Sequence, residues 1–269
     1  MKESTMTRHS RKHSETGVYH IMLRGINRQD IFEDEEDYIT FIGKLKTLTE
    51  PINDVGESIP PYCAIYAYCL MTNHVHLLLR QLTEPVSKSM QRLGVSYSRH
   101  YNNKYGHTGH LFQDRFKSEP VVDITYFIKL LQYIHQNPVA AGISDKVQDY
   151  KWSSWHEYED SNHHDLCDIR PVIDRIPLDE LRELVCNPKE GYILDDEEEY
   201  WIHKKDREIK DAICRRLNIK SLAEIQNMNK EMRIIILVEA LELGAGIRQL
   251  ARLTGISYGI IYRLKQQNH

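Results

Sequence analysis

Two apolar runs joined by a very short turn constrain the fold of this chain most strongly. Residues 62–71 are ten consecutive apolar residues, followed by Thr72-Asn73 and by a second predicted strand at 74–79, which is apolar apart from two histidines. The first run is rich in aromatic residues and too short for a membrane helix, so it is a buried strand or a core helix. Two strands joined by so short a turn pair antiparallel. This segment therefore predicts the centre of an antiparallel sheet.

The remaining elements surround this pair in an α+β order. Apolar spacing predicts a strand at 18–23 and helices at 34–48, 85–105 and 124–137. Pro138 should end the last helix, because the residue before a proline is disfavoured in the α conformation. The order strand, helix, strand, strand, helix, helix predicts an α+β domain.

Changes in composition divide the chain into four parts. The first seventeen residues are polar and basic, so we expect a mobile arm there. The composition of the chain changes after residue 158. Five consecutive acidic residues at 195–199 indicate a solvated connector. The predicted parts are a basic arm at 1–17, an α+β domain at 18–158, a connector with helical segments at 159–231 and a small all-α domain at 232–269.

The composition is that of a soluble globular protein. Apolar residues make up 41% of the chain, charged residues make up 28%, and the net charge is −4. The five cysteines are scattered and lack the spacing of zinc ribbons, so they are expected to be reduced thiols. No stretch approaches the roughly 18 apolar residues of a membrane helix. We expect a cytoplasmic protein with no membrane partner.

His74 and His76 form the sharpest chemical pattern in the sequence. On a strand alternate side chains share a face, so both imidazoles point the same way, about 7 Å apart along the strand. Histidine is the commonest metal ligand, so the pair can converge on one divalent cation. The alternative is two histidines on a solvated strand face, because so short a motif has many chance matches.

The helix at 124–137 supplies residues that can complete such a site. Tyr133 and Asn137 are one turn apart and face the same way. If that stripe faces the sheet, Asn137 offers an amide oxygen as a third ligand and Tyr133 places a phenol beside the metal. Otherwise both make ordinary hydrogen bonds at a helix edge. His135 lies about 200° around the helix from Tyr133 and is assigned to the opposite edge.

A basic window runs from Lys88 to Lys117, with six Lys or Arg residues against one carboxylate. Cations neutralise phosphates and the interleaved aromatic rings can stack on bases, which favours single-stranded or hairpin DNA. The alternative is a solvated cationic helix. Tyr97 and Tyr101 are also rival nucleophiles to Tyr133. The DNA-contacting candidates of this window are Arg92, Tyr97, Arg99, Tyr101, Lys104, Arg115 and Lys117.

The segment 247–264 has the layout of a helix-turn-helix. Ala251 is small where two helices cross, Gly255 permits a left-handed turn and Ser257 can cap the second helix. A hairpin of helices used only for packing is the alternative. As a reader of duplex DNA, the second helix would present four side chains to it, namely Tyr258, Tyr262, Arg263 and Lys265.

Four ordered blocks resemble the single-tyrosine HUH transposases, the IS200-like family, and especially their REP-associated branch. The blocks are His74-Val75-His76 and the segments 109–118, 133–142 and 150–154, and the resemblance covers about residues 17–158. It implies a ferredoxin-like HUH domain that cleaves and rejoins single-stranded, hairpin-forming DNA with Mg²⁺ or Mn²⁺. Carried over, His74, His76 and Asn137 become the metal ligands and Tyr133 the nucleophile. The simplest members of the family lack the C-terminal helices.

These patterns together predict a DNA-binding transposase active in DNA transposition and recombination. The expected activity is that of a metal-dependent single-strand endonuclease and strand transferase, acting through a 5′-phosphotyrosine on Tyr133 as a monomer or homodimer. Duplex DNA is a further expected partner, through the C-terminal helices. Two alternatives stay open: a catalytically silent DNA-binding regulator derived from such an enzyme, and a metal-dependent RNA hydrolase that uses water.

Overall fold

The computed structural model describes residues 12–113, 115–160, 166–187, 209–216, 219 and 222–267. Most of the predicted basic arm, residues 1–11, and the acidic run 195–199 lie outside these ranges. The elements in chain order are β1 (Val18–Arg24), η1 (Ile26–Arg28), α1 (Glu35–Thr49), β2 (Cys63–Leu70), β3 (His74–Gln81), α2 (Val86–Tyr105), β4 (Lys117–Pro120), α3 (Ile124–Ala140), η2 (Val147–Asp149), α4 (Trp155–Glu159), α5 (Arg170–Ile173), α6 (Leu178–Cys186), η3 (Leu222–Asn227), α8 (Lys230–Glu242), α9 (Ile247–Thr254) and α10 (Tyr258–Gln267).

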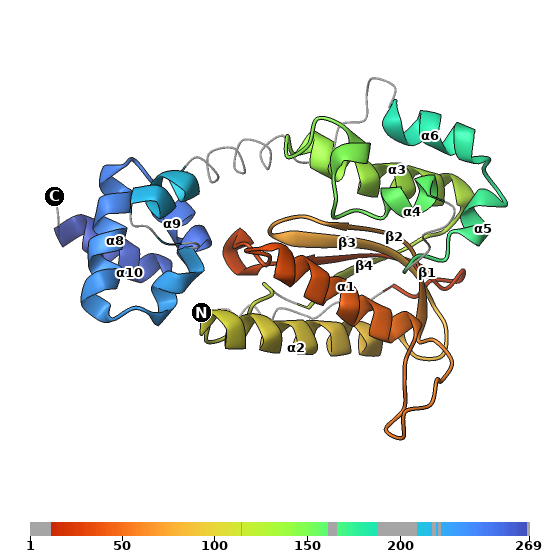
Figure 1. The fold of residues 1–269 in the computed structure, drawn as a ribbon, viewed down its shortest axis with the longest axis horizontal. Helices are drawn as coiled ribbons and strands as arrows, with labels where there is room; N and C mark the ends of the chain where they lie inside the picture. The colour runs from red at the N-terminus through yellow and green to blue at the C-terminus, as the bar shows by residue number, and fades with distance from the viewer. Residues whose placement is uncertain are drawn as a thin grey trace, which may run out of the picture.

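The strands form one antiparallel sheet in the order β2-β3-β1-β4 (Figure 1). The two apolar runs of the sequence become β2 and β3, and Met71 N–H donates to the His74 carbonyl across their turn at 2.8 Å. Met22 on β1 lies opposite His76 on β3, which fixes the register of the central pair. The predicted α+β class with an antiparallel sheet is therefore confirmed.

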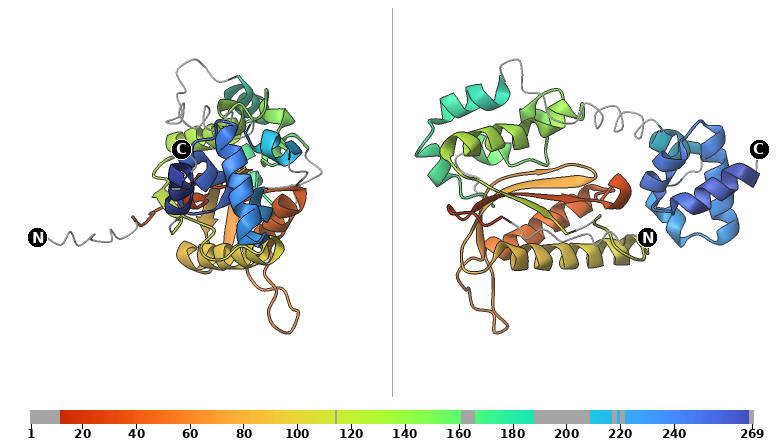
Figure 2. Two further views of the ribbon diagram at one scale, coloured as in Figure 1. Left: turned by 90° about the vertical axis from the view of Figure 1, so that its left-hand side faces the viewer. Right: turned by 180° about the vertical axis from the view of Figure 1, so that it is seen from behind.

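Helices cover both faces of the sheet, α1 and α2 on one side and α3 on the other (Figures 1 and 2). Asp34 caps α1, accepting from Asp37 N–H while the Asp37 carboxylate accepts from Asp34 N–H. This reciprocal pair satisfies backbone donors that the first helical turn leaves open. α2 ends at Gly106, whose φ of 59° is left-handed and favours glycine.

Two details differ from the sequence prediction. The short edge strand β4 was not expected, because its four residues include Lys117 and Glu119 and end in a proline. α3 continues to Ala140, past Pro138, where the helix was predicted to stop. Pro138 lies in the last turn, where its ring costs one backbone hydrogen bond and its fixed φ is still helical.

The described residues form two hydrophobic cores. The first joins the sheet to its helices and reaches to Val185 on α6. The second is built by α8, α9 and α10 and includes Ile213 and Leu222, which precede residue 232. The C-terminal helices lie at one end of the molecule (Figure 2). No helix within the described ranges is both long and apolar enough to cross a membrane.

Candidate active site

His74 and His76 lie side by side at the start of β3, on the sheet face that α3 covers. Their ring centroids are 4.9 Å apart and the rings are perpendicular. Each side chain is 2% exposed. His74 follows the tight turn directly, and strand alternation brings His76 to the same face.

Tyr133 reaches the same place from α3. Its ring centroid is 5.3 Å from that of His76, with the rings perpendicular. The Tyr133 ring is half-buried against the first core. The predicted stripe of α3 thus faces the sheet, and the phenol lies beside the histidine pair.

Asn137 lies one turn after Tyr133 on α3 and is 7% exposed. Its amide NH₂ donates to the Tyr133 carbonyl at 2.9 Å, so its amide oxygen is the atom that can ligate a cation. Among the described residues no three His, Cys, Asp or Glu side chains form a metal-binding cluster. Imidazole nitrogen with amide oxygen is a donor set that fits a divalent cation.

His20 on β1 is a member of the site that the sequence analysis missed. Its Nε2 lies 3.0 Å from His76 Nδ1, and the two rings stack with centroids 5.2 Å apart. The His20 ring also meets the edge of Tyr133 at 5.9 Å. Burial lowers the pKa of His20 to about 4, although the nearby Glu119 carboxylate acts in the opposite direction. His76 is 56 residues from His20 in sequence, so only the register of β1 against β3 could have indicated this contact.

His135, between Tyr133 and Asn137 in sequence, points to the other side of α3. It is fully buried, with Nε2 2.8 Å from Ser154 Oγ and Nδ1 2.9 Å from the Leu131 carbonyl. Its ring packs against Trp155. Burial lowers the pKa of His135 to about 3. His135 is therefore a neutral core residue, on the edge of the helix where the sequence had assigned it.

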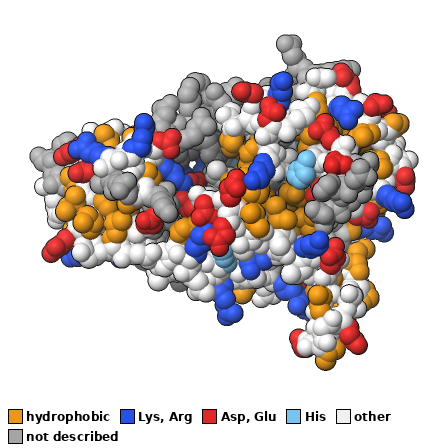
Figure 3. Space-filling view, viewed as in Figure 1, with side chains coloured by type: hydrophobic (Ala, Val, Ile, Leu, Met, Phe, Trp, Pro, Cys, Tyr) orange, Lys and Arg blue, Asp and Glu red, His pale blue; other side chains and the backbone are white. Residues whose placement is uncertain are grey.

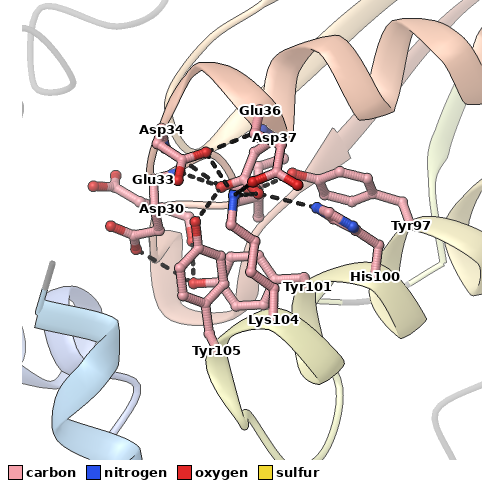
Figure 4. A network of polar contacts seen from close by, with 11 residues as sticks. Asp30, Glu33, Asp34, Glu36, Asp37, Tyr97, His100, Tyr101, Lys104 and Tyr105 are labelled. Atoms are coloured by element: carbon pink, nitrogen blue, oxygen red, sulfur yellow. Dashed lines mark hydrogen bonds and ion pairs between the residues drawn. The ribbon is translucent and has the colours of Figure 1, made fainter.

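Three of the predicted DNA contacts are instead part of a polar network between α2 and the segment 30–37 (Figure 4). Tyr97 and Tyr101 are 0% and 3% exposed, and their hydroxyls donate to the carbonyls of residues 31 and 30. Lys104 pairs with three carboxylates, those of Asp34 at 2.6 Å, Glu36 at 3.0 Å and Asp37 at 3.0 Å. These contacts use the polar groups of the three residues within the domain.

The same burial counts against Tyr97 and Tyr101 as nucleophiles. Desolvation, followed by nearby carboxylates including Asp37 and Glu33, raises the pKa of both phenols well above the usual value. An ionised phenol is the attacking form in covalent catalysis. Neither ring is therefore suited to attack a phosphodiester.

The exposed side of α2 borders a groove of about 770 Å³, completed by residues 109–112, 115 and 116 and here called the α2 groove. Arg99 and Arg115 line it and are exposed. Phe112 and Phe116 supply aromatic surface, and Asn102 supplies an amide. Lys and Arg side chains gather along this edge of the molecule, over α2 (Figure 3). The groove thus combines cations with aromatic rings.

The other two basic residues predicted to contact DNA, Arg92 and Lys117, lie in different surroundings. Arg92 is paired with Glu84 at 3.1 Å and lies over the Tyr62 ring, so it belongs to a structural pair. Lys117 is exposed at the start of β4. It pairs in register with Met22, two residues along β1 from His20, so its side chain leaves the sheet on the histidine face.

The predicted C-terminal DNA contacts lie on α10. Tyr258 and Tyr262 are 48% and 45% exposed, and their rings stack with centroids 6.0 Å apart. Arg263 is exposed and Lys265 is partly exposed. Gly255, with a φ of 67°, makes the left-handed turn between α9 and α10. The segment thus presents two aromatic rings and two cations on one short helix.

Comparison with known proteins identifies the class of the first domain. Residues 13–137 match the family described as "Transposase IS200 like". A protein of Haemophilus influenzae described as a REP-associated tyrosine transposase is 27% identical over 129 residues, covering 40% of this chain and 71% of the relative. The chain resembles the REP-associated tyrosine transposases in particular.

A solved structure of a REP-associated tyrosine transposase bound to a REP hairpin is also similar. Its TM-score is 0.44 at 18% identity, covering 57% of this chain and 86% of that chain.

Proposed function

We propose that this protein is a single-tyrosine DNA strand transferase with an active site formed by Tyr133, His74, His76 and Asn137. The observation that supports this most is the Tyr133 ring lying 5.3 Å from the His76 ring. A phenol beside paired imidazoles combines a covalent nucleophile with a site for a Lewis acid. The IS200-like family of residues 13–137 supports the same assignment.

In the proposed reaction the Tyr133 hydroxyl oxygen attacks the phosphorus of a phosphodiester in single-stranded DNA. The bond from Tyr133 Oη to phosphorus forms while the bond from phosphorus to the 3′ oxygen breaks. The phenol gives up its proton, and the departing 3′ oxygen takes one up to become a hydroxyl. The resulting 5′-phosphotyrosine conserves the energy of the ester bond. A second 3′-hydroxyl can therefore attack it, rejoining DNA and releasing Tyr133.

His74 and His76 would hold a divalent cation, with the amide oxygen of Asn137 as third ligand. Mg²⁺ or Mn²⁺ is the proposed ion, because both accept oxygen ligands. When bound, the cation neutralises charge on a non-bridging phosphate oxygen and orients the phosphorus for attack.

Single-stranded or hairpin DNA is the proposed substrate, bound along the α2 groove. Arg99 and Arg115 provide phosphate contacts there, and Phe112 and Phe116 provide surfaces for stacking. Lys117 lies on the same face of the sheet as the histidines, which supports a path for the DNA around the β4 edge to Tyr133.

The direct test uses an end-labelled single-stranded hairpin incubated with the protein and Mn²⁺ or Mg²⁺. A denaturing gel should show a protein-linked fragment that disappears with chelator and in Tyr133→Phe. Tyr101→Phe is the control, because the hydroxyl of this rival tyrosine bonds to the Asp30 carbonyl, outside the proposed active site. Binding without cleavage by the wild type would favour a silent regulator. Cleavage without an adduct would favour a hydrolase.

The C-terminal helices are proposed to bind duplex DNA through α10. Their core includes Ile213 and Leu222, so we propose that this domain begins near residue 209. Tyr262→Ala combined with Arg263→Ala should weaken duplex binding at least tenfold and leave hairpin cleavage unchanged, because α10 is not part of the proposed active site. Fluorescence anisotropy checks the binding, with Gln266→Ala as control on the same helix. Unchanged duplex affinity in the double variant would contradict the proposal.

A further inference from the structure

We propose that Asn73 and His20 are positioning residues that fix the tautomers of His74 and His76, so that each ring presents Nε2 to the cation. The inference rests on the proposed function, because it assumes that these two rings hold the metal. It adds two residues that act on the ligands and not on the substrate. Histidine ligands characteristically donate their second ring N–H to a neighbouring acceptor, which fixes both tautomer and orientation.

Asn73 determines the tautomer of His74 through the direction of its own amide. Asn73 Nδ2 donates to the Arg28 carbonyl at 3.3 Å, which turns Oδ1 toward His74. Asn73 Oδ1 lies 2.6 Å from His74 Nδ1. An amide oxygen only accepts, so the proton of His74 is on Nδ1. The lone pair of the neutral ring is then on Nε2.

The backbone holds Asn73 firmly in this position. The side chain is 1% exposed, and the Asn73 carbonyl accepts from Gly25 N–H at 2.8 Å. Gly25 is required there, because a Cβ atom would lie 2.2 Å from the Gln29 carbonyl oxygen. Arg28, whose carbonyl orients the amide, and the preceding residue Asn27 both have positive φ. The segment 25–28 is thus shaped to support the turn before His74.

His20 plays the corresponding part for His76. Its Nε2 lies 3.0 Å from His76 Nδ1, so one nitrogen of the pair must donate. Glu119 lies opposite His20 on β4 and interacts with it electrostatically. A cation bound at His76 Nε2 requires the His76 proton on Nδ1, so we infer that His76 Nδ1 donates and His20 Nε2 accepts in this contact. His76 then also presents Nε2 as its ligand atom.

Two-bond ¹H–¹⁵N spectra of the wild-type chain test the tautomers directly, without metal or DNA. The spectra are recorded with ¹⁵N-labelled histidine at pH 8, and the His74 and His76 signals are assigned by single substitutions. Both rings should be protonated on Nδ1. Protonation of either ring on Nε2 would overturn the inference.

Metal affinity provides the second test, with Mn²⁺ alone as the probe in calorimetric titrations. Asn73→Ala and His20→Leu should each bind Mn²⁺ about 10-fold to 100-fold more weakly than the wild type. Asn73→Asp and His20→Gln keep an acceptor and should restore most of the affinity. Asn53→Ala is the control, because the Asn53 side chain forms hydrogen bonds with Glu57, outside the proposed active site and the α2 groove.

The outcomes separate this inference from the proposed function. Wild-type Mn²⁺ binding with equal affinity in folded Asn73→Ala and His20→Leu would overturn the positioning role alone. Absence of Mn²⁺ binding by the wild type would overturn both. Loss of Mn²⁺ affinity in Asn73→Ala and His20→Leu, with recovery of that affinity in Asn73→Asp and His20→Gln, supports the positioning role. A purely structural defect would not be rescued by a hydrogen-bond acceptor.

Discussion

Arg92, a basic side chain predicted to contact DNA, is paired with the buried carboxylate of Glu84 while its own side chain stays 46% exposed. Glu84 is 7% exposed and accepts from Ser89 at 2.8 Å and from Arg92 at 3.1 Å. The Arg92 guanidinium also lies 4.7 Å from the centre of the Tyr62 ring. Arg92 thus packs and pairs within the domain, although the sequence alone predicted a DNA contact.

We expect Glu84→Gln to lower the free energy of unfolding by about 1 kcal/mol at pH 7. Burial opposes ionisation of Glu84, but the hydrogen bonds from Ser89 and Arg92 lower its pKa overall below the ordinary value of 4.5. The stabilisation is therefore present above that value and is lost as the pH falls through the lower pKa of the folded state. Urea denaturation at pH 7 and pH 3 checks this. A difference between wild type and variant that persists undiminished at pH 3 would contradict the assignment.

At the scale of elements, α2 separates a buried aromatic face from the face that we propose binds DNA. Tyr97, Tyr101 and Tyr105 recur every fourth residue and are all buried. Arg99 lies between them in sequence but projects into the α2 groove. Helical periodicity therefore assigns the aromatic stripe to the core and the basic side chain to solvent.

Arg99→Ala combined with Arg115→Ala should weaken binding of single-stranded DNA and reduce the salt dependence of the affinity, because each cation neutralises about one phosphate. Tyr101→Phe should leave DNA affinity unchanged, since its hydroxyl bonds inside the domain. Anisotropy titrations at several salt concentrations measure both effects. An unchanged salt slope in the double variant would place the DNA elsewhere.

The sequence predicted the elements whose signals are local. The apolar runs of β2 and β3, the histidine alternation and the Tyr133 stripe of α3 all follow from periodicity within one segment. The edge strand β4 lacks such a pattern. The ion pairs of Lys104 with Asp34, Glu36 and Asp37, like the contact of His20 with His76, join segments distant in sequence, so no local pattern indicates them.

At the scale of the whole molecule, Lys210 forms ion pairs that connect the C-terminal core to the first domain. Its ammonium lies 2.9 Å from both Asp30 and Glu33, next to the network of Figure 4. Burial disfavours the charge, but the two carboxylates raise the pKa of Lys210 well above its usual value. Asn227 adds a hydrogen bond to the Tyr105 carbonyl. The C-terminal helices are thus docked on the loop before α1 and the end of α2.

Lys210→Met should weaken this docking by about 2 kcal/mol, because it removes charge-assisted hydrogen bonds to two carboxylates. Calorimetry should then show the C-terminal core melting separately and at lower temperature. Arg216→Met is the control, since Arg216 pairs with Glu239 inside the C-terminal core. Identical melting curves for wild type and Lys210→Met would show that the ion pairs do not hold the two cores together.

The central claim, that Tyr133 attacks DNA beside the histidine pair, is tested most directly by locating the covalent adduct. The protein is trapped with a single-stranded hairpin and Mn²⁺, digested with nuclease and trypsin, and analysed by mass spectrometry. The nucleotide should be carried by the peptide 130–146, whose one tyrosine is Tyr133. A nucleotide on peptide 93–99, which contains Tyr97, or on 100–104, which contains Tyr101, would contradict the account.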